Sequence, residues 1–248
     1  MVRTALDAAA MLEVIAGRDG KDTSTSQEPV PRYSEKLKAA GLKGLRIGIL
    51  RQYFERLHPD VEKNVRLAIT EFERLGTTTN EVEIKHLNYV VPAATTIMTA
   101  EAACFHEKRL RNKADLIDPF LRVRLEAAKY TPATDYIKAQ RVRQLITQEI
   151  HSALSNCDVM LCPTMTIPAY KLDLTGGDPV RGQTLTMLAN LTGDPAIAIP
   201  CGFTNDEPIL PVSVMLHAKP FDELMLLRFA HAYQTVTRFH ERIPPVGN

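Results

Sequence analysis

The sequence contains no tryptophan, and aromatic residues make up only 6% of its 248 positions. No apolar run approaches the roughly 20 residues that a membrane-spanning helix requires, and the first residues form an amphipathic, alanine-rich pattern unlike a signal peptide. Lys and Arg number 30 against 29 Asp and Glu, so neither sign of charge dominates. Composition thus gives no electrostatic footprint for nucleic acid or an anionic membrane. We expect a cytoplasmic protein without nucleic-acid or membrane partners.

Cysteine is scarce, and its spacing fits neither a zinc site nor a small disulfide framework. The simplest expectation is that the thiols are buried as small apolar side chains. An alternative is that Cys201 is a nucleophile with His217 or His231 as its base, which would require a spatial pairing that spacing cannot reveal. No metal or cofactor is predicted. The four cysteines are Cys104, Cys157, Cys162 and Cys201.

The chain is organised around residues 185–223. Apolar residues at helical spacing end at Gly193, which can close a helix in the left-handed conformation, and Pro195 prevents the helix from resuming. Two short segments, 196–199 and 212–216, are apolar at every position or nearly so, which is typical of strands covered on both faces. These strands predict the centre of a layered α/β sheet, followed by a last helix that begins at Asp222.

The remaining elements follow from periodicity and from helix start and stop signals. Residues 18–32 are polar, with glycine and two prolines, and predict an exposed loop. Residues 45–84 read as a β-α-β unit whose helix opens at Pro59 and stops at Gly76. Further helices are expected over residues 5–16, 95–111 and 132–155, with a buried strand over 158–162.

An ordered series of short motifs runs through almost the whole chain. It resembles the amidase-signature family, to which one component of the glutamyl-tRNA amidotransferase belongs, and it covers about the second half of that family's usual domain. The motifs are Arg3-Thr4, Leu45-Arg46-Ile47-Gly48, Ala100-Glu101-Ala102, the Tyr136 to Ile146 helix, Asp158-x-x-Leu161-x-Pro163-Thr164, Asn190-Leu191-x-Gly193-x-Pro195-Ala196-x-x-x-Pro200-x-Gly202, and Lys219-Pro220-Phe221-Asp222-Glu223.

The resemblance implies an α/β fold. We expect residues 1–248 to form the C-terminal portion of an amidase-signature domain, a mixed β-sheet flanked by helices that lacks the N-terminal strands. The β-α-β unit over 45–84 would form a satellite layer, and the loop 163–168 would border the active-site cleft.

The resemblance also implies a chemistry, the hydrolysis or transfer of an amide at its carbon–nitrogen bond. Family members use a serine nucleophile that a lysine activates through a second serine in a cis peptide, and all three lie in a Gly/Ser-rich N-terminal half. Nothing in this chain matches them, because no two serines are adjacent and Gly176-Gly177 is its one glycine-rich spot. We therefore expect no catalytic residue here, and an isolated chain that is inactive.

Two residues are candidates for binding a small-molecule amide. Arg124 matches an arginine that resemblance to the amidotransferase component implicates in holding the substrate's carboxylate, a task suited to a planar guanidinium. An inter-helix or surface ion pair is an equally good interpretation of this arginine. Gln183 stands where that component has an acidic residue for the amide donor, so loss of the carboxylate argues against glutamine as the substrate. His106 could be a base in a pocket or an ordinary helix residue.

Three hypotheses remain open. Met1 resembles an internal methionine of the family, so the chain could be a fragment of an amidase without independent function. It could instead be a half-enzyme completed by a separate N-terminal chain; the possible protein partners are such an N-terminal amidase half or, in a homo-oligomer, a second copy of this chain. Finally, it could be a non-catalytic binding protein that uses the cleft around Arg124 and Gln183.

Overall fold

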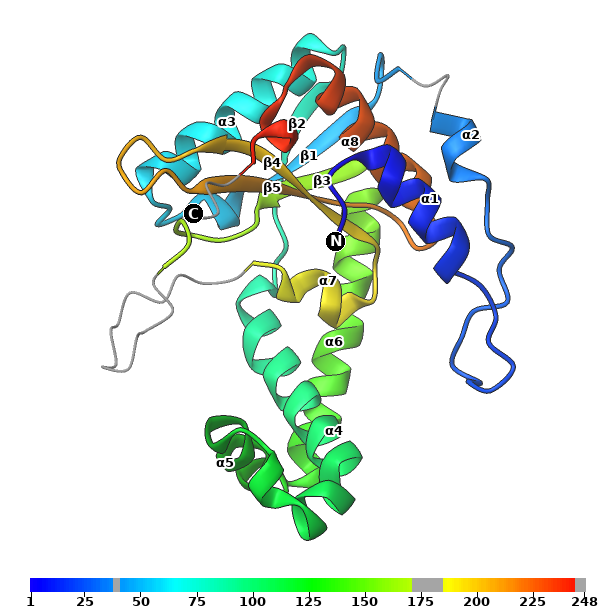
Figure 1. Ribbon diagram of the computed structural model, residues 1–248, viewed down its shortest axis with the longest axis vertical. Helices are drawn as coiled ribbons and strands as arrows, with labels where there is room; N and C mark the ends of the chain where they lie inside the picture. Colours follow the sequence, from blue (N-terminus) through cyan, green and yellow to red (C-terminus); the bar gives the residue numbers. More distant parts are fainter. Residues whose placement is uncertain (38–40, 171–184, 244–248) are drawn as a thin grey trace. The chain divides into compact units, whose positions relative to one another are not determined.

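The computed structural model describes residues 1–37, 41–170 and 185–243 (Figure 1). The chain divides into two compact units. Unit 1 comprises Met1–Glu83, Ala153–Thr186 and Asp194–Asn248, and unit 2 comprises Ile84–Ser152 and Met187–Gly193. Among the described residues, no helix is both long and apolar enough to cross a bilayer.

Unit 1 contains a five-stranded sheet and the helices that cover it. Its strands are β1 (Arg46–Leu50), β2 (Thr78–Val82), β3 (Val159–Pro163), β4 (Ala196–Phe203) and β5 (Pro211–His217). Its helices are α1 (Ala5–Ile15), α2 (Tyr33–Leu37), α3 (Pro59–Arg74) and α8 (Glu223–Val236), with short 3₁₀ turns at η1 (Arg51–Phe54) and η4 (Phe239–Glu241).

The strand order is β2-β1-β3-β5-β4. Strand β1 runs parallel to β2 and β3, whereas β5 runs antiparallel to β3 and β4. Parallel pairs require crossover connections, which α3 provides between β1 and β2, and the antiparallel pair β4–β5 is joined by a short loop. The mixed sheet flanked by helices that the sequence predicted is therefore confirmed.

The β-α-β unit predicted over 45–84 forms as β1, α3 and β2. Because β1 pairs with both β2 and β3, this unit is the edge of the same five-stranded sheet. Pro59 at the first turn and the His58 side chain, which accepts a hydrogen bond from the Asp60 amide, fix the start of α3. The loop over 18–32 contains no helix or strand.

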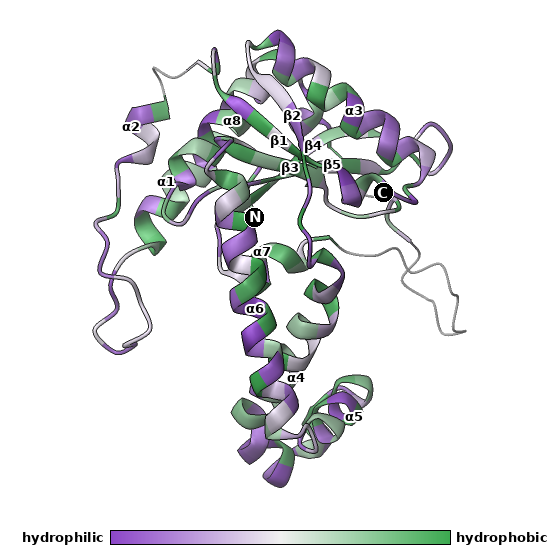
Figure 2. Ribbon diagram, turned by 180° about the vertical axis from the view of Figure 1, so that it is seen from behind, coloured by the Kyte–Doolittle hydropathy of each residue, from purple (hydrophilic) through white to green (hydrophobic). Residues whose placement is uncertain are grey.

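The main core of unit 1 lies between the sheet and two helices, α3 and α8. Phe72 of α3 packs against Phe229 and Tyr233 of α8, with ring centroids 5.6 and 4.9 Å apart. Figure 2 shows apolar residues concentrated on the central strands, while polar and apolar residues alternate along α3. Helices α1 and α2 pack on α8 through a second cluster made of Ala9, Tyr33, Leu37 and Leu227.

Strand β4 departs from the prediction that it is covered on both faces. Ile199 and Cys201 belong to the core, but Ala196 and Ala198, which point to the opposite face, are exposed. In this chain β4 is the last strand of the sheet, so its apolar sequence meets no further strand among the described residues. Strand β3, by contrast, is buried at all five positions.

Unit 2 is helical. Its elements are η2 (Leu87–Tyr89), α4 (Val90–Asn112), η3 (Ala114–Leu116), α5 (Pro119–Ala128), most of α6 (Ala133–Leu154) and α7 (Met187–Thr192). Helix α4 begins at Val90, not at Thr95 as predicted, because Pro92 falls in the first turn, where proline is tolerated. A small cluster of Leu110, Ile117 and Leu125 joins α4 to α5.

Candidate functional site

The loop after β3, predicted to border a cleft, is fixed in unit 1 by hydrogen bonds. The Thr164 hydroxyl donates to the Ser213 carbonyl oxygen at 2.9 Å and lies 2.8 Å from the Ser213 hydroxyl. The His58 amide, at the start of α3, donates to the Thr166 carbonyl oxygen at 2.8 Å. The loop is thus held against both β5 and α3.

A pocket of about 290 Å³ lies beside this loop. Apart from Ser213, the side chains that line it are apolar. The Ser213 hydroxyl already bonds Thr164, and no described histidine, lysine or carboxylate lines the pocket as a base for it. This pocket can hold a small apolar group, but it lacks the paired nucleophile and base of a hydrolase. Its lining residues are Val61, Met165, Ile167, Pro168, Ala169, Pro211, Val212 and Ser213.

A buried thiol and imidazole meet between β3 and β5. The Cys162 sulfur lies 3.7 Å from His217 Nε2, and both side chains are almost inaccessible to solvent. Burial raises the pKa of the Cys162 thiol above its ordinary range. Burial also lowers the pKa of His217 to about 4, although the charge of Asp194 opposes this shift. At neutral pH the pair is a neutral thiol and a neutral imidazole, not the thiolate and imidazolium of a cysteine hydrolase.

The alternative pairing of Cys201 with His217 or His231 is wrong for His217, whose ring contacts Cys162 instead. Cys201 is buried in the core near Tyr233, and burial raises the pKa of its thiol to about 12. The expectation of buried cysteines holds for three of the four, because Cys104 is exposed on α4. All four are free thiols.

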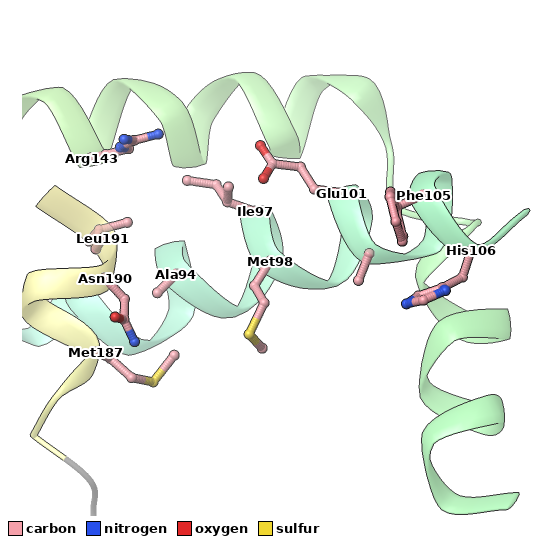
Figure 3. A pocket seen from close by; sticks show the side chains of 11 residues that line it. Ala94, Ile97, Met98, Glu101, Phe105, His106, Arg143, Met187, Asn190 and Leu191 are labelled. Atoms are coloured by element: carbon pink, nitrogen blue, oxygen red, sulfur yellow. The ribbon is translucent and has the colours of Figure 1, made fainter. Parts of the chain in front are cut away.

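A larger pocket, of about 670 Å³, lies in unit 2 where α4, α6 and α7 come together (Figure 3). Its walls are mainly apolar, and four polar side chains reach it: Glu101, His106, Arg143 and Asn190. This size and composition are typical of pockets that bind small molecules. The apolar lining residues are Ala94, Ile97, Met98, Ala102, Phe105, Met187 and Leu191.

Hydrogen bonds between α4 and α6 fix one end of this pocket. The Tyr136 hydroxyl donates to the Glu101 carboxylate at 2.8 Å and accepts a bond of 2.9 Å from the Gln140 amide. The Glu101 carboxylate is therefore oriented rather than free to rotate. Elsewhere in the unit, the His86 amide donates to Glu149 Oε2 at 3.0 Å and the His86 ring bonds Glu149 Oε1.

The two substrate-binding residues predicted from the sequence have different outcomes. Arg124 lies on the exposed face of α5, with its guanidinium carbon 5.8 Å from the centre of the Phe120 ring, and it is not among the residues that line either pocket. Gln183 lies outside the described residues. His106, weighed as a pocket base, does line the unit 2 pocket and is partly exposed.

The unit 2 pocket was not predicted. One signal was visible, since Met98, Ala102 and Phe105 recur at helical spacing and now line it from α4. Arg143 and Asn190 fall in motif segments, but sequence alone did not show that α6 and α7 bring them to one cavity. Within the described ranges, no group of three or more potential metal ligands clusters.

Comparison with known proteins agrees with this architecture. The amidase family model matches residues 1–227. An amidase of Pseudomonas putida is 37% identical over 98% of this chain and 54% of its own length, and the A component of the glutamyl-tRNA(Gln) amidotransferase of Myxococcus xanthus is 35% identical over 99% and 56%. The crystal structure of the same component from Thermotoga maritima superposes with a TM-score of 0.76 at 27% identity, over 96% of this chain and 52% of the other.

The chain spans about half the length of the curated relatives it matches. Amidase-signature enzymes of known structure have the same mixed sheet and flanking helices. This is the fold that the sequence predicted. The chain belongs to the amidase family.

Proposed function

We propose that this chain is the C-terminal part of an amidase-type hydrolase, which cleaves or transfers an amide at its carbon–nitrogen bond. The nucleophilic serine, the cis-peptide serine and the lysine of the family would come from an N-terminal half, and this chain would supply one wall of the substrate cleft. By itself it would be inactive, because both the attacking oxygen and the oxyanion hole would be missing.

The observation that carries this proposal is the edge strand β4. Its apolar sequence is that of an interior strand, yet Ala196 and Ala198 are exposed and no described strand pairs beyond it. Soluble proteins protect such edges with charge, proline, a bulge or a covering element. Pro200 and the register shift beside it protect the second half of β4, but residues 196–199 contain neither a charge nor a proline. An N-terminal half that covers β4 would explain why its sequence has the character of a sheet centre.

The chemistry of the described residues supports the same proposal. Cys162 and His217 are buried and neutral, and the Ser213 hydroxyl is bonded to Thr164. None of these groups can act as an activated nucleophile on an amide in a cleft. The loop at residues 163–168 and its apolar pocket would instead border the substrate.

Arg124 would bind a carboxylate on the amide substrate. It is exposed on α5 and forms no ion pair with any described residue. Its guanidinium is therefore free to bind a ligand that the N-terminal half would hold. Gln183 would line the same cleft. Both roles come from the family resemblance and stand as proposals to be tested in an active enzyme.

A chimaera provides the test. The N-terminal half of the Pseudomonas putida amidase is joined in frame before Met1, and hydrolysis of simple carboxamides is followed by ammonia release. We expect no turnover by the chain alone, turnover by the chimaera, and none when the nucleophilic serine of the added half is changed to alanine. Arg124→Gln in the chimaera should raise KM for a carboxylate-bearing amide, with Arg122→Gln as the matched control.

Two results would contradict the proposal. One is hydrolysis by the isolated chain that is lost when a residue of this chain is mutated. The other is a chimaera that folds cooperatively as a single unit but turns over no carboxamide.

A further inference from the structure

We propose that the unit 2 pocket between α4, α6 and α7 binds a small organic monocarboxylate with an apolar body, and that Arg143 is the residue that pairs with its carboxylate. This inference does not depend on the proposed amidase function, because the site lies wholly within unit 2 and its occupancy can be measured without any turnover.

The first argument is the unpaired cation. Arg143 lines the pocket from α6 and is half-buried. Among the described residues it takes part in no ion pair, although other arginines of this chain, such as Arg66 and Arg111, pair with a glutamate on their own helix. A partly buried charge without a partner is costly, so a guanidinium facing an apolar cavity favours an anionic ligand.

The position of the guanidinium is defined by its neighbours. A terminal nitrogen of Arg143 lies against Gly193, where a Cβ added to the glycine would be 3.9 Å away. Gly193 ends α7 with a φ of +81°, and its amide donates to the Ala189 carbonyl oxygen. The guanidinium is therefore placed at the junction of α6 and α7, where its planar fork can donate to two carboxylate oxygens.

The second argument is the character of the remaining wall. Ile97 and Met98 of α4 and Met187 and Leu191 of α7 give the pocket an apolar surface beyond the arginine. A cavity of about 670 Å³ has room for a ligand well beyond the size of acetate. Methionine side chains adapt to irregular apolar ligands, which suits an alkyl or aryl body.

The third argument concerns the other charge in the pocket. Figure 3 shows Glu101 on α4 and Arg143 on α6, with Ile97 between them. The Glu101 carboxylate is held in place by the Tyr136 hydroxyl, so it remains in the pocket as a fixed negative charge. It repels a second negative charge on the ligand, which favours a monocarboxylate over a phosphate monoester or a dicarboxylate.

The experiment compares four probes on the complete chain by isothermal titration calorimetry at neutral pH. Octanoate carries the proposed head and body, octanamide is its neutral counterpart, and octyl phosphate and suberate carry a second negative charge. We expect octanoate to bind at least about tenfold more tightly than octanamide, the factor expected of a charge-assisted hydrogen bond. Octyl phosphate and suberate should bind more weakly than octanoate.

Variants locate the effect. Arg143→Gln should remove the preference for octanoate over octanamide while leaving octanamide affinity within about twofold, and Arg141→Gln, an exposed arginine on the same helix, should leave both affinities unchanged. Glu101→Gln, which can still bond Tyr136, should raise the affinity for octyl phosphate and suberate relative to octanoate.

The comparison of octanoate with octanamide on the unmodified chain needs no variant to fold. Equal affinities for these two probes, or no heat from octanoate up to millimolar concentration, would overturn the proposal. A purely structural arginine that stabilises α7 would give a different pattern, in which Arg143→Gln lowers the melting temperature but leaves the octanoate-to-octanamide ratio as it was.

Discussion

Gly202 on β4 lies directly against the side chain of Asn64 on α3, so that a Cβ at position 202 would overlap the Asn64 carboxamide. Asn64 is buried and donates to the carbonyl oxygens of Asp60 and Phe203, at 2.7 and 3.0 Å. The β4 register shifts between Pro200 and Gly202, which brings the strand backbone close to the helix. The glycine therefore allows a helix-to-strand hydrogen bond at the edge of the sheet.

Gly202→Ala should lower the free energy of unfolding by about 1–3 kcal/mol, since a methyl group must displace a buried, hydrogen-bonded side chain. Urea denaturation followed by circular dichroism measures the change. Gly41→Ala is the matched control, because an added Cβ there meets nothing within 4 Å. Adding Asn64→Ala should make the loss less than the sum of the two single changes, and strict additivity would contradict the described contact.

A second glycine makes an independent prediction in β1. A Cβ at Gly48 would lie 2.6 Å from a Val82 methyl group and 2.9 Å from the Cys157 sulfur, both on neighbouring segments. Gly48→Ala should therefore be destabilising by overpacking, again by about 1–3 kcal/mol. The second change Val82→Ala removes the nearer obstacle and should recover part of the loss.

The double variant is informative because Val82→Ala alone should also destabilise, by removing methyl groups from a half-buried side chain. If the double variant is more stable than Gly48→Ala, loss of packing alone cannot explain it, because that loss would lower the free energy of unfolding further. If the double variant unfolds at a lower urea concentration than Gly48→Ala, steric conflict with Val82 is not the cause.

Local signals predicted most elements of this fold. Pro59 and the helical spacing of Val61, Val65 and Phe72 defined α3, and Gly193 followed by Pro195 defined the end of α7. These features depend on neighbours a few residues away, so the chain itself carries them. Strand β4 shows the limit: its residues indicated a buried strand, but its position at the edge depends on pairing partners that no local pattern encodes.

The candidate sites were harder to predict for the same reason. Cys162 and His217 are 55 residues apart in sequence and meet only because β3 and β5 are adjacent antiparallel strands. Arg143 lies within a helix that the sequence predicted. Which side chains of that helix face a cavity, however, depends on the packing of α4 and α7 against α6. Arg124, chosen by resemblance, lies on an exposed helix face, and its role remains a prediction.

His217 gives a prediction about pH. Its ordinary pKa is 6.5 and burial lowers the pKa to about 4 in the folded chain, so the unfolded chain binds more protons between these two values. Its contribution to stability is complete above about pH 6.5 and is lost as the pH falls toward 4. The loss can reach about 3 kcal/mol, from the size of the pKa shift.

The comparison that isolates this contribution is His217→Gln, measured by urea denaturation at several pH values. Carboxyl groups titrate in both proteins, so the difference between the two curves reports the imidazole. We expect the wild type to lose more stability than the variant between pH 6.5 and about 4. Parallel curves over that window would mean that His217 is not buried in its neutral form.

Thiol reactivity should separate Cys104 from the other three cysteines. Cys104 is exposed, whereas Cys157, Cys162 and Cys201 are buried and burial raises the pKa of each of their thiols. Iodoacetamide at about pH 8 should label one thiol of the folded chain and four after unfolding, as counted by mass spectrometry. Cys104→Ser should abolish labelling of the folded chain, and rapid labelling of any other cysteine would contradict its burial.

The exposed face of β4 leads to a prediction about association. Ala196 and Ala198 leave an uncharged surface on an edge strand, and such edges promote strand-to-strand pairing between molecules. The isolated chain should therefore aggregate or bind a hydrophobic dye at micromolar concentration. Ala198→Lys places a charge on this exposed position and should reduce light scattering with little change in melting temperature, because the alanine contributes little to the core.

Val14→Lys, on the exposed end of α1, is the matched control, since it removes more apolar surface at a site away from the β4 edge. A larger reduction by the control than by Ala198→Lys would show that association does not proceed through β4, and a monodisperse wild type that ignores the dye would remove the reason to expect a covering partner there.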